Sequence, residues 1–161
     1  MKTATIAIIK KELKEKSTDE LMELCLRLAK FKTENKELLT YLLFESHDDT
    51  SFIEAVKNEL ELQFCMANSN SYFYIKKSVR KILSNLKKYC RYAQNKETEL
   101  ILLMYFCNRL KDFDIRRRPD LVLENIYKRE KERIKKLISE LHEDLQFDYK
   151  QLWDSTNTDK L

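Results

Sequence analysis

The stretch that decides the fold is LILLMYFC, residues 100 to 107, which carries no charged side chain. Eight residues are too few to cross a bilayer, because a helical span takes about 20. A helix that is apolar on all sides is instead surrounded by other helices. The stretch therefore predicts a central core helix, running from about residue 96 to 112, with the rest of the fold packed around it.

The composition of the whole chain also favours helices. The 161 residues include no glycine and one proline, Pro119. Glycine supplies the positive-φ positions of hairpin turns and phosphate-binding loops, so its absence argues against β-sheets. It also excludes Walker, GxGxxG and GxSxG motifs from this sequence. We therefore predict an all-α protein that lacks these nucleotide-binding and hydrolase signatures.

Helix-start signals divide the chain into about seven helices. Capping boxes open two of them, at Ser17–Glu20 and at Ser51–Glu54. Pro119 suits the first turn of a last long helix, which we predict to run to about Leu145. The charged run KREKER, residues 128 to 133, predicts that the middle of this helix projects from the body or lies across a polar surface.

These helices predict one all-helical domain over residues 1–154 and a polar tail over residues 155–161. The architecture is either a helical bundle or a short array of armadillo-like helix pairs. A short continuation after the last long helix contains Trp153, which we expect to dock the C-terminal end onto the body.

The reactive side chains form no recognisable site. No CxxC motif occurs and no Glu-x-x-His pair precedes His47 or His142, so we expect no metal, no cofactor and no catalytic residue. A small-molecule enzyme remains a remote alternative. We expect the four cysteines to be core residues in a reducing cytoplasm. They are Cys25, Cys65, Cys90 and Cys107. The N-terminal ATIAII is too short for a secretory signal, and no run is long enough to span a membrane, which predicts a cytoplasmic protein.

The most polarised segment is YIKKSVRKILSNLKKYCRY, residues 74 to 92, with seven basic side chains and no acidic one. At 100° per residue, its apolar side chains occupy one helical face and its basic side chains the opposite face. Residues 67–95 carry a net charge of +7, although the whole chain carries only +4. The predicted binding residues are Lys76, Lys77, Arg80, Lys81, Lys87, Lys88 and Arg91.

Three interpretations of this basic face stay open. Acidic stretches elsewhere in the chain could neutralise it, which would exclude a binding role. It could bind the phosphate backbone of nucleic acid, with Tyr74 and Tyr92 stacking on bases and Arg116, Arg117 and Arg118 extending the surface. It could also bind another acidic protein, or a second copy of the chain in a homo-oligomer. We expect a non-enzymatic binding or adaptor protein with an acidic protein partner, and nucleic-acid binding is the alternative.

Four stretches resemble a family of small all-helical bacterial proteins. The resemblance covers about residues 10 to 150. The four stretches of this chain are KKELKEKSTDELMELCLRLAKFKTENKELLTYLLFESHDD, NSYFYIKKSVRKIL, KYCRYAQNKETELILLMYFCNRLK and ISELHEDLQFDY. No activity, cofactor or site is assigned to that family, so the resemblance implies no functional residue. It implies a cytoplasmic, helical, single-domain protein.

Overall fold

The computed structural model describes residues 2–67, 72–115 and 121–156. Within these residues the chain forms eight α-helices and one π-helical turn, and no β-strand. The predicted all-α class is therefore confirmed, with one helix more than the approximate number expected. The chain divides into two compact units, Met1–Phe44 and Glu45–Leu161. We call them unit 1 and unit 2.

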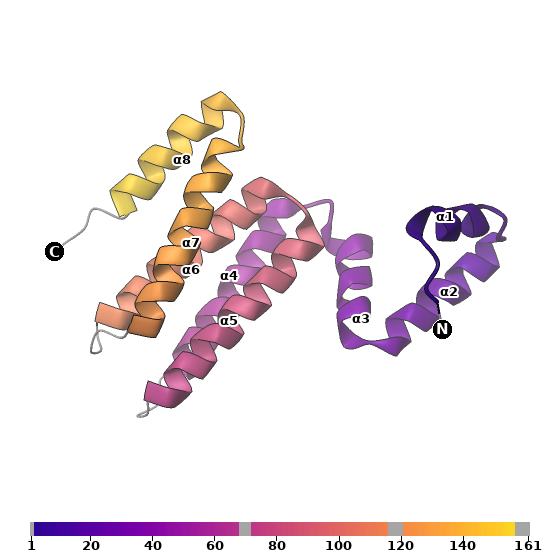
Figure 1. Cartoon of the computed structure of the whole chain (residues 1–161), viewed down its shortest axis with the longest axis horizontal. Coiled ribbons are helices and arrows are strands. Elements are labelled where there is room, and N and C mark those ends of the chain that lie inside the picture. Colours follow the sequence, from indigo (N-terminus) through magenta and orange to yellow (C-terminus); the bar gives the residue numbers. More distant parts are fainter. Residues whose placement is uncertain (1, 68–71, 116–120, 157–161) are drawn as a thin grey trace. The chain divides into compact units, whose positions relative to one another are not determined.

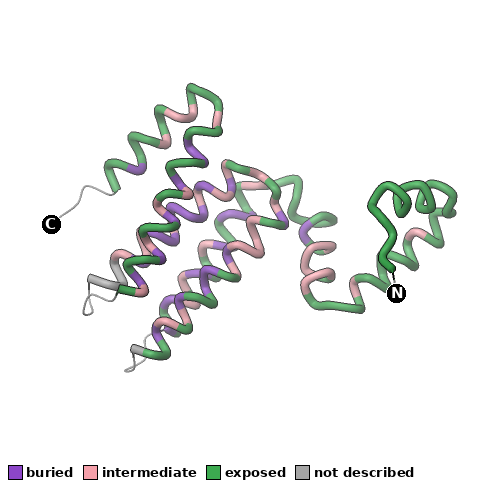
Figure 2. Tube along the Cα trace, viewed as in Figure 1, coloured by how far each residue is buried: buried purple, intermediate pink, exposed green. Residues whose placement is uncertain are grey.

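Unit 1 contains three short helices. They are α1 (Ile6–Lys14), α2 (Thr18–Phe31) and α3 (Thr33–Thr40), and a π-helical turn at Tyr41–Glu45 follows them. The capping box predicted at Ser17 is present, because the Ser17 hydroxyl accepts a hydrogen bond from the Glu20 amide, and the Glu20 carboxylate accepts one from the Ser17 amide. The capping box predicted at Ser51 was wrong, because Asp48 caps the helix Asp49–Met66 and its side chain accepts a hydrogen bond from the Ser51 amide. Helices α2 and α3 pack on each other, yet α1, α2 and α3 contain no buried residue (Figure 2).

Unit 2 contains five helices (Figure 1). They are α4 (Asp49–Met66), α5 (Tyr72–Ala93), α6 (Lys96–Ile115), α7 (Leu121–Ser139) and α8 (Glu143–Thr156). Helix α6 contacts α4, α5 and α7, whereas α8 packs on α7. The core of unit 2 therefore lies around α6.

The predicted central helix is confirmed by its burial. Leu100, Leu102 and Phe106 in α6 are each 0% exposed, and the Phe106 ring packs on Phe64 of α4 with the ring centroids 5.7 Å apart. Burying one such side chain stabilises the fold by about 1.5–3 kcal/mol. Figure 2 shows buried residues along α4, α5, α6 and α7, so α6 is the element on which α5 and α7 are positioned.

The predicted end of the last long helix was wrong. Helix α7 ends at Ser139 and α8 begins at Glu143, so no single helix runs to Leu145. The Gln146 side-chain amide donates to the carbonyl oxygen of Leu141 at 2.9 Å and thereby supports the break between the helices.

Of the two alternatives for the KREKER run, projection from the body is excluded, because Glu130 is only 1% exposed. The run instead lies across a polar surface, where Glu130 pairs with Lys87 of α5 and Arg133 pairs with Glu99 of α6.

The prediction for the cysteines was wrong for two of the four. Cys107 is buried and Cys90 is half-buried, but Cys25 and Cys65 are exposed. The expectation for Trp153 is confirmed, because this side chain is 4% exposed in α8, which packs on α7.

Candidate functional site

Helix α5 separates its apolar and basic side chains as its sequence predicts. Its apolar face is buried, with Val79 and Leu86 both 0% exposed. The helix ends at Ala93 and is followed by Gln94, which has a φ of 50°. The side chain of Asn95 then caps α6 by accepting hydrogen bonds from the amides of Glu97 and Thr98. The 22 residues of α5 therefore form a helix about 33 Å long, and its basic side chains occupy about 23 Å of that length, from Lys76 to Arg91.

The predicted basic residues fall into two rows on α5. At 100° per residue, Lys76, Arg80, Lys87 and Arg91 share a stripe about 60° wide, and Lys77, Lys81 and Lys88 share the next one. We call the second set the outer lysine row. Arg80, Lys87 and Arg91 line a groove between α5 and α7. The first row therefore faces a neighbouring helix, whereas the outer lysine row lies beside it.

This groove is an open cavity of about 610 Å³, and no carboxylate lines it. A second cavity of about 700 Å³ shares three of its basic residues and continues it toward the C-terminal end of α5. We call the two together the α5–α7 groove. Its basic residues are Arg80, Lys87, Arg91, Arg129 and Arg133, and its acidic residues are Glu99 and Glu130. The groove therefore has an excess of three positive charges.

Glu130 supplies a buried negative charge at the wall of the groove. Its Oε1 atom accepts hydrogen bonds from Lys87 Nζ at 2.9 Å and from Arg129 Nε at 2.8 Å. A buried carboxylate is costly unless it is paired, and these two cations offset that cost. The same contacts fix the two cations, one on α5 and one on α7, side by side.

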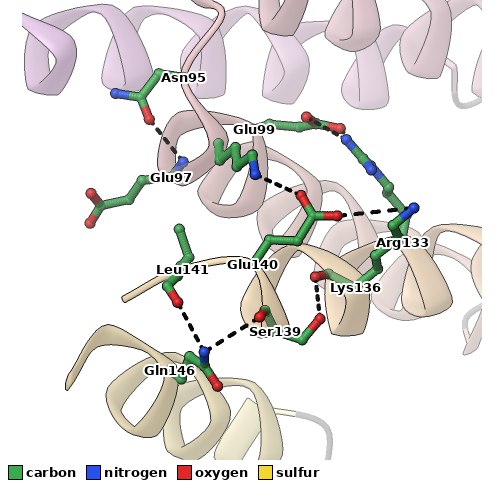
Figure 3. Close-up of polar contacts among 10 residues, drawn as sticks. Asn95, Glu97, Glu99, Arg133, Lys136, Ser139, Glu140, Leu141 and Gln146 are labelled. Atoms are coloured by element: carbon green, nitrogen blue, oxygen red, sulfur yellow. Dashed lines mark hydrogen bonds and ion pairs between the residues drawn. The ribbon is translucent and has the colours of Figure 1, made fainter. Parts of the chain in front are cut away.

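Arg133 is neutralised in a different way. Its guanidinium makes two hydrogen bonds to the Glu99 carboxylate, each 2.9 Å long, and Figure 3 shows this pair beside the junction of α7 and α8. The hydrogen bonds to Glu99 raise the pKa of Arg133 further. Glu140 forms a separate ion pair with Lys96, with the Nζ and Oε2 atoms 2.9 Å apart. The Glu99–Arg133 pair joins α6 to α7 at the wall of the groove.

Four of the predicted residues carry charge without a partner inside the described part of the chain. Arg80, Lys77, Lys81 and Arg91 are exposed, and none of them makes an ion pair with a described residue. Lys87 is paired with Glu130, and Lys76 and Lys88 are both half-buried and also make contacts. Acidic residues thus neutralise only part of the basic face.

The predicted aromatic and arginine extensions of the face have different outcomes. Tyr74 is 59% exposed and its ring packs against Phe73 with centroids 5.6 Å apart. Tyr92 is only 8% exposed and packs on Tyr89, so the prediction that it stacks on bases was wrong. Arg116, Arg117 and Arg118 lie outside the described residues.

The contribution of α7 was missed in the sequence. Val122, Ile126, Arg129 and Arg133 follow one another at spacings of four, three and four residues, which places them on one face of a helix. This face forms the α7 side of the groove. The spacing was visible in the sequence, but the partner helix on which it lies was not.

A second polar cluster joins α4 to α6. Arg109 donates to the two Glu61 oxygens at 2.6 and 2.7 Å, and the Tyr105 hydroxyl donates to Glu61 at 2.9 Å. Burial opposes ionisation of Glu61, but the bonds from Arg109 and Tyr105 outweigh it and lower its pKa. Glu61, Arg109 and Tyr105 bond to one another in this cluster, so the cluster holds α4 and α6 together and offers no free binding group.

The cysteine in the groove is not an activated nucleophile. Burial, with a further contribution from the Glu99 carboxylate, raises the pKa of Cys90 to about 12. Nucleophilic cysteines need a lowered pKa to be thiolates at neutral pH. The groove therefore offers positive charge and apolar surface rather than a reactive thiol.

Comparison with protein-family models, with curated proteins and with solved structures gives no match for this chain. Among residues 2–67, 72–115 and 121–156, no group of three or more histidine, cysteine or acidic side chains could hold a metal ion. In the same residues no helix is both long enough and apolar enough to cross a membrane.

Proposed function

We propose that this protein is a non-enzymatic binding or adaptor protein that takes an acidic partner protein into the α5–α7 groove. Arg80 and Arg91 bind carboxylates of the partner, and the outer lysine row attracts its more distant negative charges. Arginine suits this role, because its planar guanidinium forms two parallel hydrogen bonds with a carboxylate.

The observation that carries this proposal is the pair of arginines on the rim of the groove. Arg80 and Arg91 lie eleven residues apart on one stripe of α5, or about 16 Å along the helix axis. Both are exposed and neither pairs with a described carboxylate. The nearby cations Lys87 and Arg129 already share Glu130. An incoming acidic group therefore meets two arginines whose hydrogen-bonding capacity is unused.

The floor of the groove favours a protein over a nucleic acid. Leu83 and Ile126 lie at its base, and Val122 adds half-buried apolar surface. An amphipathic acidic helix can place apolar side chains on this floor and carboxylates on the arginines. A phosphate backbone would use the arginines and leave the floor uncovered.

One observation supports nucleic acid as a second candidate partner. Phe73 and Tyr74 are 70% and 59% exposed at the start of α5, one helical turn before Lys77. Stacking of a base on such a ring contributes about 1–3 kcal/mol. A single strand could thus place bases on this aromatic pair and phosphates on the outer lysine row.

The test is a titration with a defined probe. A labelled helical peptide with leucines on one face and glutamates on the other is titrated into the full chain over a series of salt concentrations. We expect salt-sensitive binding that weakens by about tenfold or more in the double variant Arg80→Gln/Arg91→Gln, because a hydrogen bond between charged groups contributes about 1.5–3 kcal/mol.

The matched control is Lys135→Gln/Lys150→Gln, which removes the same charge at exposed positions of unit 2 that do not line the groove. This variant should lose no more affinity than its change in net charge explains. Equal losses in the two variants would reduce the effect to net charge and contradict the proposal. A single-stranded oligonucleotide of the same charge is the second probe. If only this probe binds, and if Tyr74→Ser weakens it, the partner is nucleic acid.

A further inference from the structure

Unit 1 exposes a large apolar surface that its own helices do not cover. We call this surface the unit 1 apolar face. The exposed fractions of its residues run from 39% for Leu24 to 84% for Phe31. Its members are Ile6, Ile8, Ile9, Leu13, Met22, Leu24, Leu26, Leu28, Phe31, Leu42, Leu43 and Phe44. A set of large apolar side chains of this size is normally buried when a unit folds by itself.

The pattern of α2 explains why its apolar side chains stay exposed. At 100° per residue, they cover an arc of about 220°, from Phe31 round to Leu26, and charged side chains occupy the remainder. A surface helix that packs on one side needs an apolar stripe of only about 100°. Helix α3 contacts part of this arc. The remainder borders an open cavity of about 530 Å³ between α2 and α3, lined by Leu26, Leu43 and Phe44 among others.

The exposed apolar area of unit 1 is large enough to supply one side of a stable protein dimer. Twelve large apolar residues at these exposed fractions present on the order of 1,000 Å². A standard interface buries about 800 Å² on each partner. Monomers rarely expose contiguous apolar patches above a few hundred Å².

The charges around the face favour a second copy of the same chain. Residues 1–44 carry nine basic and seven acidic side chains, so the two signs are mixed. The basic side chains of α1, such as Lys11 and Lys14, can lie opposite acidic side chains of α2, such as Asp19 and Glu23, in another copy. Helix α5 has only basic side chains on its polar face and would repel a copy of itself.

We propose that two copies of this chain associate through their unit 1 apolar faces, in a symmetric dimer in which the same surface contributes from each copy. The dimer buries helices α1, α2 and α3 against their counterparts. The proposed contact lies in unit 1 alone, and it does not rest on the function proposed for the α5–α7 groove of unit 2.

The first test is sedimentation of the full chain over a range of concentrations. We expect a species of twice the 19.5 kDa chain mass. The double variant Leu28→Ser/Phe31→Ser should raise the dimer Kd by about tenfold or more, since central interface residues dominate affinity. Both side chains are exposed, at 61% and 84%, so their replacement should leave the helical circular dichroism signal unchanged.

The matched control is Leu62→Ser/Phe147→Ser, whose residues in unit 2 are exposed to 61% and 69%. This control should dimerise like the unmodified chain. Equal dissociation of the two variants would place the contact elsewhere and overturn the proposal. A monomer at every concentration would overturn it as well.

The native cysteines give a second test that needs no substitution. Cys25 lies in the apolar arc of α2, whereas Cys65 lies in unit 2, and both thiols are exposed. Burial raises the pKa of Cys90 and Cys107 to about 12, so these thiols react slowly. Alkylation of Cys25, but not of Cys65, should slow as the protein concentration rises. If the Cys25 rate does not depend on concentration, the face is not covered by a second copy.

Discussion

Glu130 shows how one residue can set both the stability and the charge of a surface. Its carboxylate is 1% exposed, while its partners Lys87 and Arg129 keep 43% and 64% of their side chains in solvent. The cations can therefore hydrate if the carboxylate is lost, but the carboxylate cannot hydrate if they are lost. Removing the charge of Glu130 should consequently separate the two properties.

We predict that Glu130→Gln lowers the free energy of unfolding and raises the affinity for acidic ligands. The loss of hydrogen bonds between charged groups should destabilise the fold by about 1–3 kcal/mol. Freed from their carboxylate, Lys87 and Arg129 should strengthen binding of the glutamate–leucine peptide several-fold. Urea unfolding and peptide titration measure the two effects.

The control for this prediction is Glu132→Gln in the same helix. Glu132 is 70% exposed and pairs with Lys135 on the surface, so its replacement should change stability by no more than about 0.5 kcal/mol. A Glu130→Gln protein that binds the peptide more weakly would contradict the role assigned to this residue.

The lowered pKa of Glu61 makes the free energy of unfolding depend on pH. Its folded pKa is lowered relative to the ordinary value of 4.5, so the unfolded chain takes up the proton first as the pH falls. The stabilisation from Arg109 and Tyr105 is therefore complete above about pH 4.5 and is lost as the pH falls through the folded pKa. Urea midpoints measured from about pH 6 to about pH 3 should fall less steeply in Glu61→Gln than in the unmodified chain. If the urea midpoints of the two proteins fall equally steeply with pH, Glu61 is not the source of this pH dependence.

At the scale of the elements, the sequence predicted the apolar and polar sides of single helices better than it predicted which helices pack on each other. The basic and apolar sides of α5 follow from residue spacing alone, as does the burial of α6. The α7 side of the groove depends on which helix packs beside α5, and that is a long-range property. The break between α7 and α8 was missed because it has neither glycine nor proline, and depends on the Gln146 side chain.

The junction of α5 and α6 carries backbone strain that a substitution can relieve. Gln94 is the one non-glycine residue with positive φ in the described part of the chain. A residue with a Cβ atom is disfavoured there by about 1 kcal/mol relative to glycine. We predict that Gln94→Gly raises the free energy of unfolding by about 0.5–1 kcal/mol, measured by urea or thermal unfolding.

The same substitution inside a helix should act in the opposite direction. Gln151 is exposed within α8. Gln151→Gly should therefore destabilise the protein by about 1 kcal/mol. Destabilisation by both substitutions would mean that the positive φ of Gln94 is not the source of strain.

At the scale of the whole molecule, composition was enough to predict the fold class. The absence of glycine pointed to helices joined by short turns, and the described chain contains no strand. The division into two units was not predicted, because the amphipathic pattern of α2 looks the same whether its apolar arc lies in a core or in solvent. Patterns of this kind show which side chains need cover, but not what covers them.

The two units therefore offer surfaces of different chemistry. Unit 2 has a basic groove, and unit 1 has an apolar face bordered by charges of both signs. Electrostatic attraction at the groove should weaken with salt, whereas apolar burial in unit 1 should not. Salt thus distinguishes partner binding from self-association in one sample.

The most direct test of the central claim is to locate a bound acidic peptide by nuclear magnetic resonance. The arginine Nε–Hε signals of the full chain are followed while the glutamate–leucine peptide is added. We predict that the signals of Arg80 and Arg91 shift with the same affinity, while that of Arg109, held by Glu61 between α4 and α6, stays in place. Saturable peptide binding that leaves Arg80 and Arg91 unmoved would contradict the assignment of the α5–α7 groove.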